Sequence, residues 1–272
     1  MMKPLTSIRS ATAMRLLCAA ALASVSLQTF AAGESCVTQS ASARVTVLEL
    51  YTSEGCNSCP PADRWVSSLP AKGFTPDRVI ALAFHVDYWD QLGWPDQLAK
   101  AQFSSRQRMQ AERRRANMVY TPQLLLNGSD YRSYSDNRLD ESIRALNRLP
   151  PAAELLLRQR PGNSGVEVEL DMRLAQPVAG GIAQTYFAVT ENRLQSAIKA
   201  GENKGKLLRH DFVVRELTGP LPMDQAGGLQ WKVTITLPRD WKRTDLSLVA
   251  FVQDASSGEI LQALLAPLCA RP

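Results

Sequence analysis

The chain has 272 residues, closer to two domains of ordinary size than to one. Hydrophobic residues make up 45% of it and charged residues 21%, which are globular values and argue against a disordered, fibrous or coiled-coil chain. The formal net charge of +5 suggests a nucleic-acid partner only if the cations belong to the folded part of the chain.

The N-terminal segment has the pattern of a cleavable secretory signal. Lys3, Arg9 and Arg15 precede an apolar run from 16 to 27 and a small-residue site ending at Ala31. The run has about 12 residues, short of the roughly 20 that a membrane-spanning helix needs. We therefore expect residues 1–31 to be a signal peptide, leaving a periplasmic or secreted protein without a membrane span. An uncleaved anchor is the alternative.

Removal of this leader changes both the charge and the cysteine count. The remaining chain has 28 basic and 26 acidic residues, a net charge of +2, which does not support a nucleic-acid partner. Cys18 leaves with the leader, so Cys36, Cys56, Cys59 and Cys269 remain. An even number of cysteines in an exported protein favours disulfide chemistry over a reduced cytosolic zinc site.

Residues 40–150 predict strands alternating with helices. Apolar, β-branched runs and a turn pair predict strands, and proline-initiated or polar helix-favouring stretches predict helices. The expected strands cover 44–50, 79–86, 123–126 and about 130–134, and the expected helices cover 60–69, 96–118 and about 137–149. This order predicts an α/β thioredoxin-like domain, a mixed sheet flanked by helices.

Residues 160–268 have a different pattern. Short strand-like runs are separated by turn pairs such as Gly180-Gly181 and Ser257-Gly258, and helix-period stretches are nearly absent. The runs cover 166–172, 185–189, 212–217, 229–237, 246–253 and 260–265. They predict a second, all-β sandwich-like domain after a proline-rich boundary near residues 150–161.

Cys56 and Cys59 are the main candidate site. Two intervening residues let the first thiol stay exposed at a helix N-terminus while the second lies one turn inside. The helix dipole stabilises a thiolate there and can lower a thiol pKa from about 8.5 to roughly 3.5–7.5. We expect Cys56 to attack a substrate disulfide and Cys59 to resolve the mixed disulfide, without a cofactor.

Two other readings of this pair stay open. The bond can be purely structural, or Cys56 and Cys59 can bind Cu(I) together with His85 on the next strand, because thiolates and imidazole suit a soft metal. His85 and His210 are the only histidines, which excludes a site with several imidazoles.

Three candidate residues lie at or just after the carboxyl end of the second expected strand, where α/β sheets tend to place their sites. His85 or Asp87 could move protons during exchange, and the loop at Trp89 could surround a substrate. The alternative is a capped strand end with buried aromatic side chains. Arg113-Arg114-Arg115, with Arg106 and Arg108, predict a solvated helix face, with an anion-binding patch as the alternative.

Cys36 and Cys269 stand at opposite ends of the mature chain. A bond between them would close almost the whole chain, with an entropic stabilisation of at most about 5 kcal/mol. We expect a structural disulfide that fastens the N-terminal segment to the end of the second domain. The alternative is a relay in which one of the two exchanges with Cys56.

Several motifs in order resemble a known family. They are the segment from Glu49 through Cys56-Asn57-Ser58-Cys59 to Pro61, His85-Val86-Asp87-Tyr88-Trp89-Asp90, Tyr120-Thr121-Pro122-Gln123 with Asn127-Gly128, and Gly201-Glu202-Asn203-Lys204-Gly205. Together they resemble the bacterial secreted thioredoxin-like family called domain of unknown function 1223, over about residues 45–266. The resemblance implies a thioredoxin-like domain with an appended β-rich domain, in which Thr121 and Pro122 form a cis-proline loop facing the dithiol.

The family has no assigned activity, so the resemblance implies no substrate. The residues themselves predict an exported thiol–disulfide oxidoreductase that acts on a protein or small-molecule thiol or disulfide. The alternative is a periplasmic binding module, for copper handling or protein docking, whose dithiol is a metal ligand or a structural disulfide.

Overall fold

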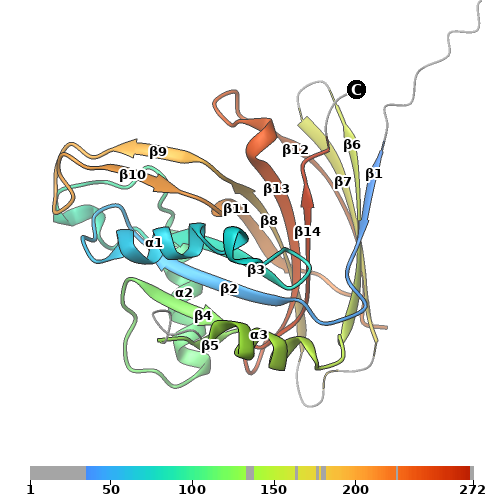
Figure 1. Cartoon of the computed structure of the whole chain (residues 1–272). Helices are drawn as coiled ribbons and strands as arrows, with labels where there is room; N and C mark the ends of the chain where they lie inside the picture. Colours follow the sequence, from blue (N-terminus) through green and yellow to red (C-terminus); the bar gives the residue numbers. More distant parts are fainter. Residues whose placement is uncertain are drawn as a thin grey trace, which may run out of the picture. The chain divides into compact units, whose positions relative to one another are not determined.

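Two large sheets and a separate hairpin carry the fold (Figure 1). The computed structural model describes residues 35–132, 138–162, 165–175, 178, 182–224 and 226–269. The eight-stranded sheet contains β2 (Thr46–Thr52), β3 (Val79–His85), β4 (Gln123–Leu126), β5 (Ser129–Asp130), β8 (Ala183–Glu191), β11 (Val213–Leu221), β13 (Leu246–Asp254) and β14 (Ile260–Pro267). The four-stranded sheet contains β1 (Cys36–Gln39), β6 (Ala153–Pro161), β7 (Gly165–Leu174) and β12 (Gly228–Thr236).

The remaining elements are a hairpin and short helices. The hairpin pairs β9 (Leu194–Ala197) with β10 (Leu207–His210). The α-helices within the described residues are α1 (Cys59–Ser67), α2 (Ala101–Arg113) and α3 (Leu139–Asn147), and the 3-10 turns are Pro70–Lys72, Asp90–Leu92 and Arg243–Asp245. The predicted leader, residues 1–31, lies outside the described residues, as do residues 133–137 at the predicted strand near 130–134 and the start of the helix near 137–149.

The eight-stranded sheet joins strands from both predicted halves of the chain. Its order is β14-β13-β8-β11-β3-β2-β4-β5. The parallel pairs are β2 with β3 and β3 with β11, where Val213 is opposite Ala83 and the Ala83 N–H donates to the Phe212 carbonyl. The predicted fold class, an α/β thioredoxin-like domain followed by a separate all-β sandwich-like domain, is therefore wrong.

The two halves share one sheet because two separate domains would leave one edge of β3 without a hydrogen-bonding partner. A strand such as β3, buried on both faces, cannot leave its outer N–H and C=O groups unpaired, and β11 supplies the missing partner. The fold is mostly β structure, with one mixed and one antiparallel large sheet. The predicted domain boundaries, 40–150 and 160–268, remain a prediction about which segments fold as units.

The four-stranded sheet packs against the β8, β13 and β14 part of the larger sheet. Side chains along β6 and β7 alternate between buried and more exposed positions, as a strand with one covered face requires. The buried set on this interface includes Leu155, Leu157, Val168, Leu170, Phe187, Leu248 and Leu264. The Cys36–Cys269 disulfide joins β1 to the segment after β14, so the expected bond between these cysteines is confirmed.

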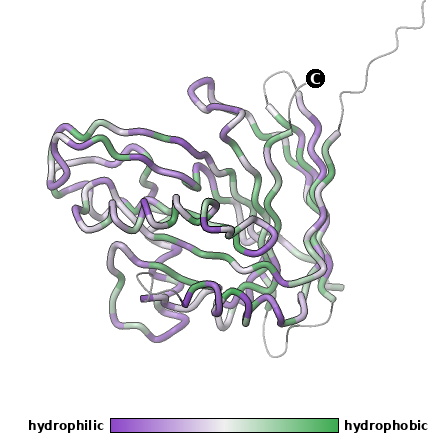
Figure 2. The backbone as a smooth tube through the Cα atoms, in the orientation of Figure 1, coloured by the Kyte–Doolittle hydropathy of each residue, from purple (hydrophilic) through white to green (hydrophobic). Residues whose placement is uncertain are grey.

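Helices cover both faces of β2, β3 and β4. Leu50 and Val66 belong to a core that β2 shares with α1 and α3, whereas Tyr51, Phe84 and Phe103 belong to a second core beneath α2. All seven residues of β2 are buried, which explains its continuous apolar run. Figure 2 shows hydrophobic residues along these central strands and hydrophilic residues at the tip of the β9–β10 hairpin.

A buried ion pair fastens α2 to the sheet. Arg106 is only 3% exposed, and its Nε and Nη2 donate to the Glu49 carboxylate at 2.9 and 2.8 Å. The guanidinium lies over the rings of Phe84, Tyr186 and Phe251, which come from β3, β8 and β13. The prediction of a solvated helix face is therefore wrong for Arg106, whereas Arg108 and Arg115 are exposed.

Other buried side chains donate further hydrogen bonds to the Glu49 carboxylate. The Tyr51 hydroxyl donates to Glu49 at 2.6 Å and Gln110 donates at 3.4 Å. Burial alone would raise the pKa of Glu49, but the charge of Arg106 and these donors hold it below its usual value. We call Glu49, Tyr51, Arg106, Gln110 and Gln253 the arginine network, because Gln253 also contacts the guanidinium.

Candidate functional site

Three sequence-predicted segments meet at one edge of the sheet. Parallel β2 and β3 end together, with Thr52 opposite His85. Antiparallel β4 begins beside them, with Gln123 opposite Tyr51. The loop with Cys56, the end of β3, and the Thr121–Pro122 pair that precedes β4 therefore lie at this edge, and the Thr121–Pro122 peptide bond is cis.

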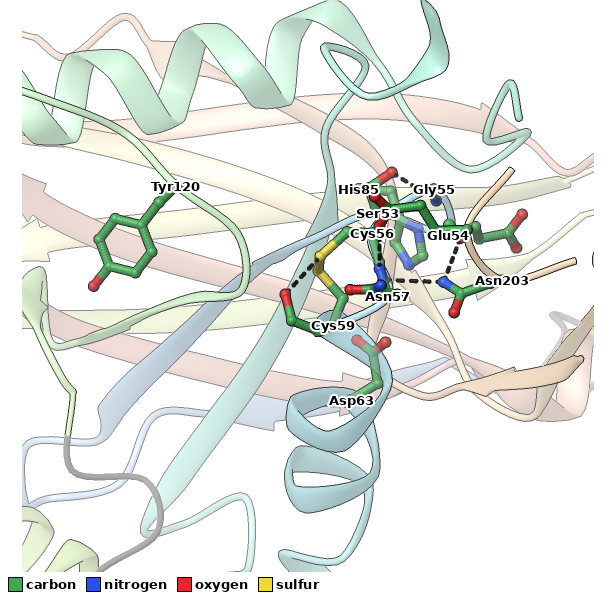
Figure 3. Close-up of a disulfide and its surroundings, with 12 residues drawn as sticks. Ser53, Glu54, Gly55, Cys56, Asn57, Cys59, Asp63, His85, Tyr120 and Asn203 are labelled. Atoms are coloured by element: carbon green, nitrogen blue, oxygen red, sulfur yellow. Dashed lines mark hydrogen bonds between the residues drawn. A yellow bond between two sulfur atoms is a disulfide. The ribbon is translucent and has the colours of Figure 1, made fainter. Parts of the chain in front are cut away.

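Cys56 and Cys59 form a disulfide in the loop between β2 and α1 (Figure 3). The Cys56 N–H donates to the Ser53 carbonyl at 3.2 Å, and the Cys59 N–H donates to the Cys56 carbonyl at 3.3 Å. These turns bring the two Cα atoms to 5.5 Å. α1 begins at Cys59, and prolines stand in its first turn, where a missing N–H leaves no intrahelical bond unmade.

Both cysteines are fully buried, with an exposed fraction of 0% each. The expectation that the Cys56 thiol is exposed at the helix N-terminus is therefore wrong. The helix starts only at Cys59, and residues from the β9–β10 turn bind the loop around Cys56. The Asn203 amide Nδ2 donates to the carbonyls of Glu54 and Cys56 at 2.8 and 2.9 Å (Figure 3).

His85 is held by a carboxylate beside the cysteine loop. Its Nδ1 lies 2.7 Å from Oδ2 of Asp96, and both side chains are fully buried. The same Asp96 carboxylate accepts the backbone N–H groups of Glu54 and Leu98, each at 2.9 Å. Burial alone would raise the pKa of Asp96 and lower that of His85, but their attraction reverses both shifts. The arrangement therefore favours an ionised pair.

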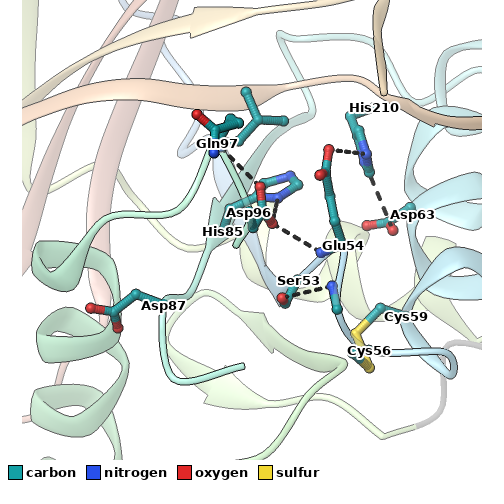
Figure 4. A network of polar contacts seen from close by, with 12 residues as sticks. Ser53, Glu54, Cys56, Cys59, Asp63, His85, Asp87, Asp96, Gln97 and His210 are labelled. Carbon is teal, nitrogen blue, oxygen red and sulfur yellow. Dashed lines mark hydrogen bonds and ion pairs between the residues drawn. A yellow bond between two sulfur atoms is a disulfide. The ribbon is translucent and has the colours of Figure 1, made fainter. Parts of the chain in front are cut away.

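The second histidine of the chain lies against the first. The rings of His210 and His85 meet edge to face, with centroids 4.8 Å apart. His210 Nε2 is 3.4 Å from Oε1 of Glu54, and its Nδ1 is 4.0 Å from Oδ2 of Asp63 (Figure 4). The indole of Trp94 donates to the other Glu54 oxygen at 2.7 Å.

The two carboxyl groups beside His210 titrate differently. Burial raises the pKa of Asp63, and the nearby histidines only partly offset this effect. Burial also acts on Glu54, but the contact with His210 and the Trp94 donor bring the Glu54 pKa below its usual value. We call Glu54, Asp63, His85, Asp96 and His210 the histidine network.

Several atoms of this network lack hydrogen bonds. Among the described residues, the buried Nε2 of His85 has no hydrogen-bond partner. The ring nitrogens of His210 reach Glu54 and Asp63 only as ion pairs at 3.4 and 4.0 Å, without a well-formed hydrogen bond. Native proteins pair most buried polar atoms, so a group of unpaired ones at one place requires a reason.

The structure also places the other predicted site residues, Asp87 and Trp89, and the residue before Thr121. Asp87 turns away from the disulfide in Figure 4 and accepts the Ser104 hydroxyl of α2, so it caps the loop after β3. Trp89 packs on Gly55, where an added Cβ would lie 3.3 Å from the Trp89 Cβ. Tyr120, just before Thr121 and Pro122, lies across from the disulfide in Figure 3.

Sequence reasoning missed most of the histidine network and its cover. His210 and Asn203 contact residues more than 140 positions earlier in the chain, and no local pattern announces such contacts. The one usable signal was the motif Gly201-Glu202-Asn203-Lys204-Gly205, which had no assigned role.

The structure does not arrange Cys56, Cys59 and His85 as ligands for a copper ion. The two cysteines are bonded to each other, and Nδ1 of His85 is engaged by Asp96. In the part of the chain that the structure describes, no group of three or more His, Cys, Asp or Glu side chains is placed to hold a metal ion. Within the same residues, no helix has the length and apolar composition to cross a membrane.

The region that contains the motifs named in the sequence analysis also matches a protein-family model. Residues 47–253, more than half of the chain, match the family described as "Protein of unknown function (DUF1223)". The chain belongs to the DUF1223 family. No curated protein matches it.

Two solved structures resemble this DUF1223 chain. The crystal structure of protein AGR_C_4864 from Agrobacterium tumefaciens has a TM-score of 0.60 and 25% sequence identity, covering 85% of this chain and 98% of that chain. HBP35 of Porphyromonas gingivalis has a TM-score of 0.62 and 16% identity, covering 85% of this chain and 78% of that chain. At 16% identity the likeness shows the fold alone.

Proposed function

We propose that this protein is an exported thiol–disulfide oxidoreductase in which Cys56 and Cys59 are the reactive pair. The observation that carries the proposal is the buried histidine network beside the Cys56–Cys59 bond, several of whose polar atoms make no well-formed hydrogen bond. Unpaired buried polar atoms are costly, and perturbed ionisable groups gather at functional sites. A bond with a purely structural role would need neither.

The proposed step is an ordinary exchange reaction. A partner thiolate attacks the sulfur of Cys56, the Cys56–Cys59 bond breaks, and Cys59 leaves with the bonding electron pair as a thiolate. This thiolate lies at the first residue of α1, where the positive end of the helix dipole stabilises negative charge. In the reverse direction Cys59 attacks the mixed disulfide, restores the bond and releases the partner thiolate.

Asp63 is the group best placed to exchange a proton with Cys59. It follows Cys59 by four residues on α1, so both side chains share one face of the helix. Figure 4 shows its carboxyl between Cys59 and His210. Because burial raises the pKa of Asp63, this carboxyl keeps a proton to higher pH and can give it to the Cys59 thiolate.

The Cys36–Cys269 disulfide supports the proposed periplasmic or secreted location. Such bonds persist in oxidising compartments and are rare in the cytosol. The leader pattern of residues 1–31 agrees with export. The partner is then a thiol or disulfide, on a protein or a small molecule, in that compartment.

Trapping of mixed disulfides tests the proposal. Cys59→Ala leaves Cys56 able to attack a partner but removes the group that resolves the product. We expect this variant to accumulate mixed disulfides in a periplasmic extract, visible on non-reducing gels and mapped to Cys56 by mass spectrometry. The double variant Cys56→Ala/Cys59→Ala should trap nothing. A single variant that also traps nothing contradicts the proposed exchange.

A further inference from the structure

The turn between β9 and β10, residues Gly201–Gly205, lies over the loop that carries Cys56 (Figures 1 and 3). We propose that this covering turn controls access to Cys56, and that Asn203 is the positioning residue that holds it closed. The inference rests on the proposed function, because access matters only if the Cys56–Cys59 bond exchanges with a partner.

The amide of Asn203 is fully used in this contact. Its side chain is buried, and its two N–H groups bind the carbonyls of Glu54 and Cys56 at 2.8 and 2.9 Å. Its oxygen accepts the Lys206 ammonium at 2.8 Å, which fixes the orientation of the amide. Each donor and acceptor of the group thus has a partner. The contact joins residues 147 and 149 positions apart, so it holds two otherwise separate segments together.

Two further contacts fasten the turn on either side of Asn203. The Glu202 carboxylate accepts the Asn57 N–H at 3.1 Å. On the other side, Gly201 has a φ of +69°, and a Cβ at this position would lie 3.1 Å from the Trp94 Cβ. Trp94 donates to Glu54 of the histidine network, so the turn also packs closely against a residue that binds the cysteine loop.

The cover has a direct consequence for reactivity. Asn57 and Ser58 are exposed, yet Cys56 and Cys59 have no exposed surface. A thiolate must approach the attacked sulfur in line with the S–S bond, so exchange requires a segment beside the buried pair to move first. The segment that moves in this proposal is the turn bound to the Cys56 carbonyl. One net hydrogen bond changes such an opening equilibrium by a factor of about five, and two bonds therefore by about 25.

The test is the rate at which dithiothreitol reduces the Cys56–Cys59 bond. Dithiothreitol is oxidised to its cyclic disulfide, and the protein bond takes up two electrons and two protons. In the wild-type protein we expect the rate to reach a plateau at high dithiothreitol, where opening of the turn limits reduction. Asn203→Ala should raise the initial slope roughly ten- to thirtyfold and move the plateau upward.

Two controls and a second variant separate access from general destabilisation. Lys204→Ala changes an exposed residue of the same turn whose side chain does not bind the cysteine loop, and it should react like the wild type. The Cys36–Cys269 bond in the same sample should be reduced at an unchanged rate. Glu202→Ala, at an exposed position that tolerates change, should give a smaller rise of a few fold.

A slope that stays linear in dithiothreitol and equal in the wild type and Asn203→Ala would overturn the inference. An equal rise at Cys36–Cys269 would also overturn it, because opening would then be global. If Asn203→Ala fails to fold, Glu202→Ala alone decides the question in the same way. This chemical reduction needs no biological partner, so a faster Asn203→Ala combined with no trapped mixed disulfide would refute the proposed function and leave the cover intact.

Discussion

The arginine network and the histidine network are both buried beside β2, and they differ in how completely they are paired. Glu49 and Glu54 stand five residues apart in the sequence. The Glu49 carboxylate accepts two bonds from Arg106 and one from Tyr51. Beside Glu54, in contrast, His210 is held only by ion pairs at 3.4 and 4.0 Å, and among the described residues Nε2 of His85 has no hydrogen-bond partner.

The difference separates a structural role from a chemical one. A fully paired buried ion pair fixes the position of its elements, and in this fold it attaches α2 to strands from both predicted halves of the chain. Groups held only by long contacts, such as His210 and Asp63, can exchange a proton without breaking a short hydrogen bond. The network beside Cys56–Cys59 is of this second kind, so we expect variants of the two networks to affect different observables.

Removal of the arginine has the largest expected effect on stability. Arg106→Met leaves the Glu49 carboxylate buried without its counter-ion, and breaking a buried pair in this way typically costs about 3–5 kcal/mol. Urea unfolding measures the loss. Arg108→Met changes an exposed arginine on the same helix and should alter stability by about 0.5 kcal/mol or less. Equal losses in the two variants would contradict a special role for Arg106.

Removal of a carboxyl from the histidine network should affect the reaction more than the fold. Asp63→Asn keeps the shape of the side chain but cannot give a proton to Cys59, and loss of a general acid typically costs a factor of about 100 or more. Stopped-flow measurement of exchange with a small thiol, starting from the oxidised protein, gives the rate. An unchanged rate would show that Asp63 takes no part in proton transfer.

The same variant has a smaller effect with a defined sign in pH. The pKa of Asp63 is raised on folding, so between pH 3.8 and the folded-state pKa the folded state binds more protons than the unfolded state. The wild type therefore loses the contribution of Asp63 to stability as pH rises through the folded-state pKa. Relative to the wild type, Asp63→Asn should gain stability over that interval, and unfolding free energies measured across pH check the direction.

Local sequence signals predicted one part of this site and long-range contacts determined the other. The strand before Cys56, the prolines after Cys59, and the Thr121–Pro122 pair are local patterns, and the structure brings them to one sheet edge. Neither the pairing of β11 with β3 nor the contact of Asn203 with Cys56 has a local pattern. Each depends on which distant segment satisfies a buried backbone group.

Arg106 shows a second limit of prediction from sequence, namely that the burial of a helix face can depend on a distant residue. Its neighbours Phe103 and Gln110 lie three and four residues away on the same face of α2, and all three are buried. The sequence presents this face as polar, so it predicts solvent exposure. It became interior because Glu49 of β2 provides a buried counter-ion, which the sequence of α2 alone does not reveal.

The reduction potential of Cys56–Cys59 tests the central claim most directly, with Cys36–Cys269 as an internal comparison. Equilibration of the protein with glutathione buffers, followed by mass spectrometry of alkylated cysteines, gives both values. An exchanging pair should equilibrate at a potential in the range of about −120 to −270 mV that known thiol–disulfide exchange proteins span, while a structural bond should lie below about −300 mV. The account predicts the first result for Cys56–Cys59 and the second for Cys36–Cys269. A value below about −300 mV for Cys56–Cys59 as well would contradict it.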